Sequence, residues 1–497
     1  VGGVASSPSS SSSSGGSVEL SPADQVMKAD EDRLRQLFAT NRTDPVIADQ
    51  HVHLLDVYSH AVSSSFVVAD GDRMRSLPPR VLTYRHDGDR RVAGARSVVD
   101  SAQFRQNMAK FTMGILDNVD FSHVLWAGGG VLACMLGDSA ASPAADGFEN
   151  SDIDLFIHSV RDEAHANEVV KHVYNCLAAN TSTTPTVVRT RFAITIVNSF
   201  PRRHVQVVLR LYKSPAEVLM GFDIDACAVG FDGSRVLALP RSRRAINTMV
   251  NVVDMSRRSL TYEARLYKYA KRGFAVAIPG FRRSNVDALK IVEAEATLKK
   301  KGVEGPQGLA KLLAYEYRAA VKQSEPLRGP HAHAALVGGT DDNNRALGVE
   351  PIIDDDSDYN DVFIPWGPQW VGNRVRAMLL RAERSHFFKP LARGDKVKHQ
   401  HSLVAGTIDD VISGRAMWCR ICRLQQQQQQ QQQQAQQPLS AENFAKRSTH
   451  GALRWVLDNP GRQLLTGSFH PVDDEKWFTS AYVASAATAT TTTTTTA

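Results

Sequence analysis

The spacing of apolar and polar positions between residues 101 and 283 predicts an ordered run of helices and strands. Residues 101–117 repeat apolar side chains every three to four positions, which is the helical period. A short apolar run at 123–127 leads directly into three glycines, and a second apolar helix follows at 131–136. The pattern therefore predicts a strand that turns into a helix through Gly128–Gly130.

Beyond this junction the pattern predicts mostly strands. The expected elements are a strand at 151–157, a helix at about 162–179, strands at 187–198 and 204–212, a short helix at 214–220, a strand at 222–231, a turn at Asp232-Gly233 and a last strand to 239. Short strands joined by tight turns and interleaved with helices are typical of mixed sheets. We therefore predict an α/β (α+β) fold, a mixed and largely hairpin-connected sheet flanked by helices.

Composition divides the rest of the chain. Residues 1–20 are rich in Ser and Gly, 425–438 are nearly all Gln, and 484–497 are almost only Ala and Thr. None of these segments offers varied apolar side chains to offset the entropy of ordering, so we expect them to be disordered. The remaining expected regions are an N-terminal region (21–100), the α/β domain (101–245), a basic helical region (246–325), an acidic, Gly-rich loop (326–362), a C-terminal region (363–424) and a C-terminal segment (439–483).

Composition also limits the class of protein. The chain has 497 residues and a formal net charge of +6, and it lacks an apolar run long enough for a membrane-spanning helix. Its five cysteines are an odd, scattered set, which is typical of a reducing compartment. Cys419 and Cys422 have metal-ligand spacing, but no second pair follows them. We expect an intracellular protein, cytoplasmic or nuclear, without a membrane partner.

The features that carry chemistry are the three glycines and a pair of aspartates. Glycines at the start of a helix let the backbone approach a ligand, and the free N–H groups there favour phosphate. Asp152 and Asp154 alternate along a strand, so both carboxylates project from one face. Two neighbouring carboxylates repel unless a cation lies between them, and their hard oxygens select Mg²⁺ or Mn²⁺. A phosphate-binding turn beside a metal-binding pair predicts nucleotidyl transfer from a nucleoside triphosphate (NTP).

This arrangement resembles the signature of the DNA polymerase β-like nucleotidyltransferase superfamily. The residues concerned are Ala127-Gly128-Gly129, a helix, and then Ser151-Asp152-Ile153-Asp154-Leu155. The resemblance covers residues 101–245 and implies that Gly128, Gly129 and Gly130 bind the triphosphate while Asp152 and Asp154 hold the metal. A second stretch, 203–225, is similar to one in uncharacterised fungal and protist proteins, and that likeness implies no activity.

Two departures from the superfamily pattern bear on activity. The loop before Asp152 is extended by an apparent insertion at 139–150, and the position of the usual third acid holds Gln206. Gln206 offers a carbonyl oxygen to a metal but brings no charge. Asp223 and Asp225 are expected on the next strand, where one of them would supply the missing catalytic acid; otherwise the site binds one metal or none.

The charge balance downstream leaves the partner open. Residues 201–283 hold 16 Lys or Arg against 6 Asp or Glu, a net charge of +10. Such a surface can bind phosphates or RNA and other nucleic acids. Alternatively, Tyr262, Leu266 and Tyr269 form the core stripe of a helix whose charges face solvent. Three hypotheses follow: an Mg-NTP-dependent nucleotidyltransferase acting on an unknown acceptor, a catalytically inactive module that binds nucleotide or nucleic acid, and an interaction scaffold acting through its polyglutamine and Ser-rich segments.

Overall fold

The structure is a computed structural model. The residues that it describes are 19–83, 91–136, 148, 151–190, 192–259, 261–287, 291, 307–324, short stretches between 364 and 378, 404–414, 452–457, 464–465 and 477. The predictions for residues 1–18, 326–362, the polyglutamine segment 425–438, the tail 484–497 and the Cys419/Cys422 pair lie outside these ranges.

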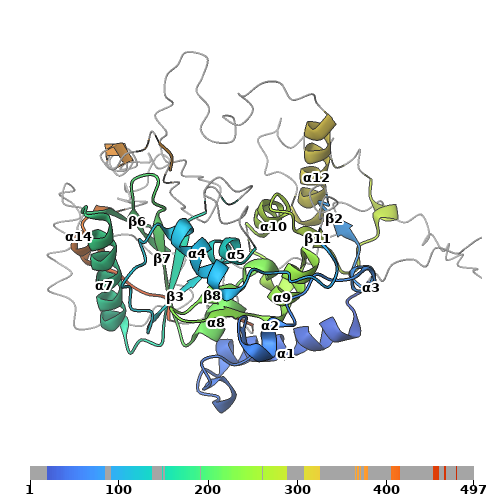
Figure 1. Cartoon of the computed structure of the whole chain (residues 1–497), viewed down its shortest axis with the longest axis horizontal. Coiled ribbons are helices and arrows are strands. Elements are labelled where there is room, and N and C mark those ends of the chain that lie inside the picture. Colours follow the sequence, from blue (N-terminus) through green and yellow to red (C-terminus); the bar gives the residue numbers. More distant parts are fainter. Residues whose placement is uncertain are drawn as a thin grey trace, which may run out of the picture.

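Strands and helices alternate along the chain as expected for an α/β protein (Figure 1). The strands are β1 (Leu55–Asp56), β2 (Arg80–Val81), β3 (Val124–Ala127), β4 (Ile153–His158), β5 (Thr186–Arg189), β6 (Ala193–Val197), β7 (Val205–Tyr212), β8 (Val229–Phe231), β9 (Val236–Ala238), β10 (Val250–Val252), β11 (Ala275–Ala277) and β12 (Val404–Gly406). The helices are α1 (Pro22–Thr40), α2 (His60–Ser63), α3 (Gly71–Arg75), α4 (Ser101–Thr112), α5 (Gly129–Met135), α7 (Glu163–Thr181), α8 (Pro215–Met220), α9 (Pro240–Thr248), α10 (Tyr262–Ala270), α12 (Gly308–Ser324) and α14 (Ile408–Ser413), with short 3-10 turns at Pro45–Ile47, Asp225–Cys227, Met255–Arg257 and Arg283–Asn285.

Nine of these strands form one mixed sheet in the order β1-β9-β8-β3-β4-β7-β6-β5-β12. Strands β4 and β7 are parallel, and the other described neighbours are antiparallel. Turns between consecutive strands produce the hairpins β5–β6, β6–β7 and β8–β9, of which the sequence predicts the last two. Strands β3, β4 and β7 lie next to one another in the middle of this sheet, where they place the candidate site.

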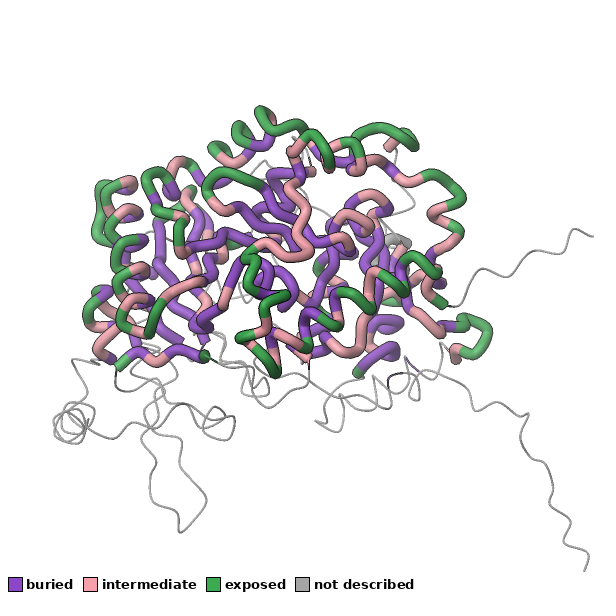
Figure 2. The backbone as a smooth tube through the Cα atoms, turned by 90° about the horizontal axis from the view of Figure 1, so that it is seen from below, coloured by how far each residue is buried: buried purple, intermediate pink, exposed green. Residues whose placement is uncertain are grey.

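Helices cover both faces of the large sheet because alternate strand residues are apolar on both sides. Val124 and Trp126 of β3 belong to the core shared with α4, α5 and α7. Leu125 and Ala127 face the opposite core, which contains α8 and Phe38 of α1. The buried interior therefore runs through the sheet on both faces, with exposed residues along the outer helices (Figure 2). The predicted mixed sheet flanked by helices is confirmed.

A smaller sheet, ordered β10-β11-β2, lies beside α10 and α12 (Figure 1). Helix α10 packs through Tyr262, Leu266 and Tyr269, which are 0%, 0% and 6% exposed. The alternative in which these residues form a core stripe is therefore confirmed. Among the described residues, none of the helices combines the length and the apolar character that a membrane crossing requires.

Two predicted strands differ from the structure. The single strand expected at 187–198 is a hairpin of β5 and β6, closed where the Thr190 N–H donates to the Ala193 carbonyl (2.9 Å). The strand expected at 222–231 is extended only at 229–231. Before it the chain makes a 3-10 turn because the Ala228 N–H donates to the Asp225 carbonyl (3.2 Å), so Asp223 and Asp225 do not share a strand face.

Candidate functional site

The glycine turn between β3 and α5 brings the backbone close to an aspartate. Gly128 has φ of +91°, a conformation that L-residues with a side chain rarely adopt. A Cβ atom at this position would lie 3.2 Å from the Phe222 ring and 4.0 Å from Oδ2 of Asp154. The turn therefore requires glycine and leaves its backbone beside the Asp154 carboxylate.

Strand pairing fixes the position of Asp154 in the sheet. It pairs with Ala127 on antiparallel β3 and with Gln206 on parallel β7. Its strand neighbours Ile153 and Leu155 are fully buried on the other face. Asp154 is half-buried, and Asp152, which immediately precedes β4, is exposed. Gly128, Asp154 and Gln206 thus come together at the same end of three adjacent strands, as the sequence predicts.

The surroundings of the two aspartates disfavour their charged forms. Burial raises the pKa of Asp154 to about 7, and the neighbouring Asp152 carboxylate adds to the rise, while Lys268 and Arg272 oppose it. Burial likewise raises the pKa of Asp152 to about 6, while the positive charges of Lys268 and Arg203 lower it. The Asp152 side chain nevertheless reaches solvent. A cation bound between the carboxylates would relieve this cost, because the charged forms would then be paired.

Helix α10 and the turn after it supply positive charge to the same place. A Cβ atom on Gly129 would lie 2.9 Å from the Tyr269 hydroxyl and 3.0 Å from Nη1 of Arg272. The other terminal nitrogen of Arg272 donates to the Ser151 hydroxyl (2.7 Å). Lys268, on the same helix, is exposed, and its electrostatic partners include both site aspartates. Arg272 therefore links the glycine turn to the residue before Asp152.

A second buried arginine holds the start of β4. Nη1 of Arg203 donates to the carbonyl of Ser151 (2.7 Å) and to that of Phe148 (3.3 Å). Its guanidinium also lies 4.0 Å from the centre of the Phe111 ring. Two arginines from different elements thus fix Ser151. Sequence analysis counted Arg203, Lys268 and Arg272 only within the general basic excess, and the signal that it missed is the four-residue spacing of Lys268, on α10, and Arg272, in the turn directly after it.

Three other predicted site residues have different surroundings. Gly130 is buried, and a Cβ there would lie 3.0 Å from the Trp126 ring, so this glycine packs against the core. Asp223 is buried in an ion pair with Arg265 (2.6 Å). Asp225 pairs with Arg241 (3.1 Å) and Arg244 (2.6 Å) and accepts the Val252 N–H (3.0 Å). The structure does not bring Asp225 to the glycine turn.

The oxygen atoms at the turn are suited to one divalent cation. Asp152 and Asp154 offer carboxylate oxygens, and Gln206, which pairs with Asp154, offers a carboxamide oxygen. Hard oxygen ligands of this kind suit Mg²⁺ and Mn²⁺. Within the described part of the chain, no group of three His, Cys, Asp or Glu side chains is placed to hold a metal. The donor set is therefore one acidic ligand short of the three that the superfamily resemblance implies.

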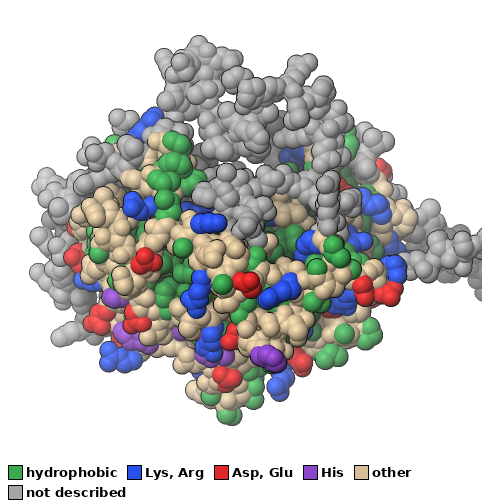
Figure 3. All heavy atoms as spheres, viewed as in Figure 1, with side chains coloured by type: hydrophobic (Ala, Val, Ile, Leu, Met, Phe, Trp, Pro, Cys, Tyr) green, Lys and Arg blue, Asp and Glu red, His purple; other side chains and the backbone are tan. Residues whose placement is uncertain are grey.

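The basic excess of residues 201–283 is only partly a surface feature. Six of its arginines are buried: Arg203, Arg210, Arg241, Arg257, Arg258 and Arg272. Arg241 and Arg257 pair with the buried Glu31 at 3.0 and 2.6 Å. On the face seen in Figure 3, basic and acidic side chains are interspersed. The net charge of this segment therefore overstates the charge that it presents to a partner.

Comparison with known proteins gives one family and one curated relative. The profile of the Gabija anti-defense 2 (Gad2) family matches residues 102–248, which include the glycine turn, both aspartates and Gln206. An uncharacterised protein of Acanthamoeba polyphaga mimivirus is 29% identical over 198 residues, covering 37% of this chain and 42% of the relative. The chain thus spans less than half of that relative's length.

Two solved structures are similar over part of the chain. A Bacillus stearothermophilus CCA-adding enzyme in complex with CTP is 15% identical with a TM-score of 0.24, covering 43% of this chain and 50% of the enzyme. A CdnC:HORMA-deltaN complex from E. coli gives a chain that is 12% identical with a TM-score of 0.18, covering 46% of this chain and 62% of that one.

Proposed function

We propose that this chain is a nucleotidyltransferase-like protein that binds an Mg-NTP and transfers its nucleoside monophosphate (NMP) to an acceptor hydroxyl. The observation that supports this most is the approach of Gly128 to Asp154, 4.0 Å from an ideal Cβ to the carboxylate. A glycine turn lets phosphate approach the backbone, and the paired aspartates provide metal ligands. The glycine turn and the paired aspartates are therefore close enough for one nucleotide to contact both.

The cations around the turn support a triphosphate as the ligand. Nη1 of Arg272 lies 3.0 Å from the position that a Cβ atom on Gly129 would take. Lys268 interacts electrostatically with both aspartates. In the proposed complex the aspartates hold the metal, and these two cations turn to the phosphate oxygens. Guanidinium and ammonium groups both bind phosphate well, the first through paired hydrogen bonds.

The proposed reaction is a substitution at the α-phosphorus. The acceptor oxygen forms a bond to this phosphorus, the bond to the bridging oxygen of pyrophosphate breaks, and the acceptor proton leaves to a base. A bound metal would supply charge stabilisation to the phosphate oxygens. The chain's own residues would orient the triphosphate through Arg272 and Lys268, and Asp154, whose pKa burial raises to about 7 in the metal-free site, would give up its proton on binding the metal.

Gln206 favours a second candidate, a nucleotide- or nucleic-acid-binding module without turnover. A carboxamide beside Asp154 completes a metal shell without adding charge, so a second metal would be held weakly. Asp223 remains the candidate borrowed acid for the enzyme, and it would first have to leave Arg265. The Gad2 match spans the site, so a role in countering the Gabija defence, as the family's name states, would use this same site.

Pyrophosphate release distinguishes the two candidates. The full chain would be incubated with each NTP, Mg²⁺ or Mn²⁺ and a panel of RNA ends, proteins and small hydroxyl compounds, with EDTA as the control. Release that depends on metal and acceptor supports the transferase. Metal-dependent NTP binding without release under every condition supports the module, and no NTP binding at all would contradict the transferase and a nucleotide-binding module.

A further inference from the structure

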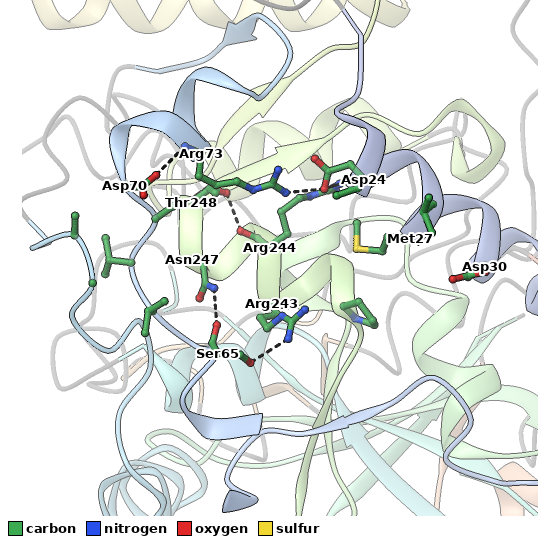
Figure 4. Close-up of a pocket in the computed structure, with 18 of the residues that line it drawn as sticks. Asp24, Met27, Asp30, Ser65, Asp70, Arg73, Arg243, Arg244, Asn247 and Thr248 are labelled. Carbon is green, nitrogen blue, oxygen red and sulfur yellow. Dashed lines mark hydrogen bonds and ion pairs between the residues drawn. The ribbon is translucent and has the colours of Figure 1, made fainter. Parts of the chain in front are cut away.

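A cavity of about 960 Å³ lies between α1, α9 and the segment 65–73, and its lining residues include none of the candidate nucleotide site (Figure 4). Its volume is at the upper end of the range for small-molecule sites. Residues of α1 line part of it, and Arg243, Arg244 and Asn247 of α9 line another part. The cavity therefore joins three segments that are far apart in the sequence.

Arg243 is the cation without an acidic partner in this cavity. Its guanidinium is half-buried, and Nη1 donates to the Ser65 hydroxyl (3.0 Å), as Figure 4 shows. The carboxylates of the described residues form no ion pair with it, whereas its neighbour Arg244 pairs with Asp24 at 3.2 Å and Asp225 at 2.6 Å. Arg243 therefore keeps most of its N–H groups available to a ligand.

The three acids that line the cavity do not compete for Arg243. Asp24 is neutralised by Arg73 (2.7 Å) and Arg244. Asp70 accepts the backbone N–H of Arg73 (2.8 Å) as the cap of α3. Asp30 is exposed, and the described residues form no ion pair between it and Arg243. The formal charges of the lining acids and arginines balance, and Arg243 is the arginine among them for which the described residues form no ion pair.

Two further nitrogen atoms of the lining are buried and lack a hydrogen-bond partner: Nε2 of His53 and Nε of Arg244. The Arg244 side chain is only 8% exposed. Buried polar nitrogens usually find an acceptor, and leaving one unpaired is destabilising. A ligand with acceptor oxygens would satisfy both atoms along with Arg243.

Part of the remaining lining is apolar. Its larger apolar residues are Val26, Met27, Val67, Val68 and Pro240. Val26 is 63% exposed although its side chain is apolar, and it lies at the cavity wall contributed by α1. Together with the nitrogen donors, this wall fits a ligand that has an anionic end and a flat or apolar body.

We propose that this cavity binds a small organic phosphate of nucleotide size. Its phosphate pairs with Arg243, its other oxygens accept from His53 and Arg244, and its ring packs against the apolar wall. Arginine favours phosphate because the planar guanidinium offers two parallel N–H donors. The site is separate from the proposed Mg-NTP site, so it does not require the catalytic proposal to be correct.

The test is calorimetric titration of the full chain with the four nucleoside 5′-monophosphates in EDTA, which prevents binding through a divalent metal. We expect saturable binding of at least one, at least tenfold weaker binding of the matching nucleoside, and weak binding of inorganic phosphate. Arg243→Met should weaken the NMP about ten- to hundredfold, the usual worth of a charge-assisted hydrogen bond. Arg161→Met, an exposed arginine on another surface, is the matched control and should change nothing.

A second readout keeps the proposal falsifiable if Arg243→Met folds poorly. Arg243→Lys retains the charge but not the paired donors, so it should bind the NMP more weakly than the wild type. The imidazole resonances of His53 should shift on titration. Absence of saturable binding, binding unaffected by both Arg243 variants, or binding lost in the Asp152→Asn/Asp154→Asn variant would overturn the assignment.

Discussion

Asp154 on β4 and Gln206 on β7 occupy paired positions of two parallel strands, so a carboxylate and a neutral carboxamide stand side by side at the candidate site. Burial and the Asp152 carboxylate already raise the pKa of Asp154 to about 7. A third acid at position 206 would raise the repulsion further in the metal-free protein. Compared with an acid at this position, Gln206 therefore lowers the electrostatic repulsion in the metal-free site. It also leaves the metal-bound site with less negative charge.

The double variant Asp152→Asn/Asp154→Asn should abolish Mg²⁺-dependent NTP binding and leave the fold intact. Removing two like charges relieves repulsion in the metal-free site, so the free energy of unfolding should stay the same or rise slightly. Titration of labelled NTP with Mn²⁺ and thermal denaturation check the two expectations. Asp117→Asn, at an exposed position, is the control; a double variant that unfolds would assign these carboxylates a structural role.

Replacing Gln206 with Asp should strengthen metal binding by about tenfold, because a carboxylate replaces a neutral ligand beside Asp154. The variant should also be less stable without metal, since three acids would then repel one another. Mn²⁺ affinity measured with and without NTP checks the first expectation. An unchanged affinity would mean that the side chain at position 206 does not reach the metal.

Asp223 and Asp225 should respond differently to substitution. If Asp223 is the borrowed acid, Asp223→Asn removes turnover while NTP affinity changes little, because the loss affects the transition state. Asp225→Ala should instead destabilise the fold by about 3–5 kcal/mol, the usual cost of breaking a buried ion pair, since Arg241 and Arg244 lose their partner. Pyrophosphate release and urea unfolding measure these effects; full turnover in Asp223→Asn excludes the borrowed-acid mechanism.

Gly129→Ala should weaken NTP binding by displacing Arg272. The added methyl group would lie 3.0 Å from Nη1 of Arg272 and 2.9 Å from the Tyr269 hydroxyl, so at least one of them must move. We expect a loss of about 1–3 kcal/mol in stability from overpacking. Adding Tyr269→Phe should recover part of it. The control is Gly71→Ala, whose nearest neighbour is the flexible end of Arg75.

Stability should fall in acid through Glu31. Burial alone would raise its pKa, but Arg241, Arg257 and Arg35 outweigh it and lower the pKa to about 2 from 4.5. At a pH between these two values the folded state thus binds fewer protons than the unfolded state. Glu31 therefore contributes to the free energy of unfolding above pH 4.5, and this contribution is lost as the pH falls toward 2. The expected loss is about 3 kcal/mol. Glu31→Gln should flatten the curve in that range, as urea unfolding at stepped pH would reveal.

The parts of the site that share one local pattern could be predicted from the sequence. Alternation along 205–211 predicts that Gln206 faces away from Val205, Val207 and Leu209, and these three apolar residues are fully buried. The same reasoning places Asp154 on the face opposite Ile153 and Leu155. Period-two geometry is local, and a buried face specifies the register strongly.

The contributions of other elements could not be predicted in this way. Tyr269 and Arg272 approach Gly129 only because α10 packs against the turn, and local spacing carries no information about that packing. The strand expected at 222–231 is present only at 229–231, because the chain before it makes a 3-10 turn at Asp225, whose carboxylate pairs with Arg241 and Arg244. Partners distant in the sequence decide both cases.

Strand β12 has a consequence for any shortened form of this protein. Val404, Ala405 and Gly406 pair with Arg189, Val188 and Val187 of β5, more than two hundred positions earlier in the chain. Without β12, one side of β5 would present unsatisfied N–H and C=O groups along an apolar strand. Unprotected edges of this kind promote pairing between molecules. A protein truncated before residue 404 would therefore be prone to self-association even with its candidate site intact.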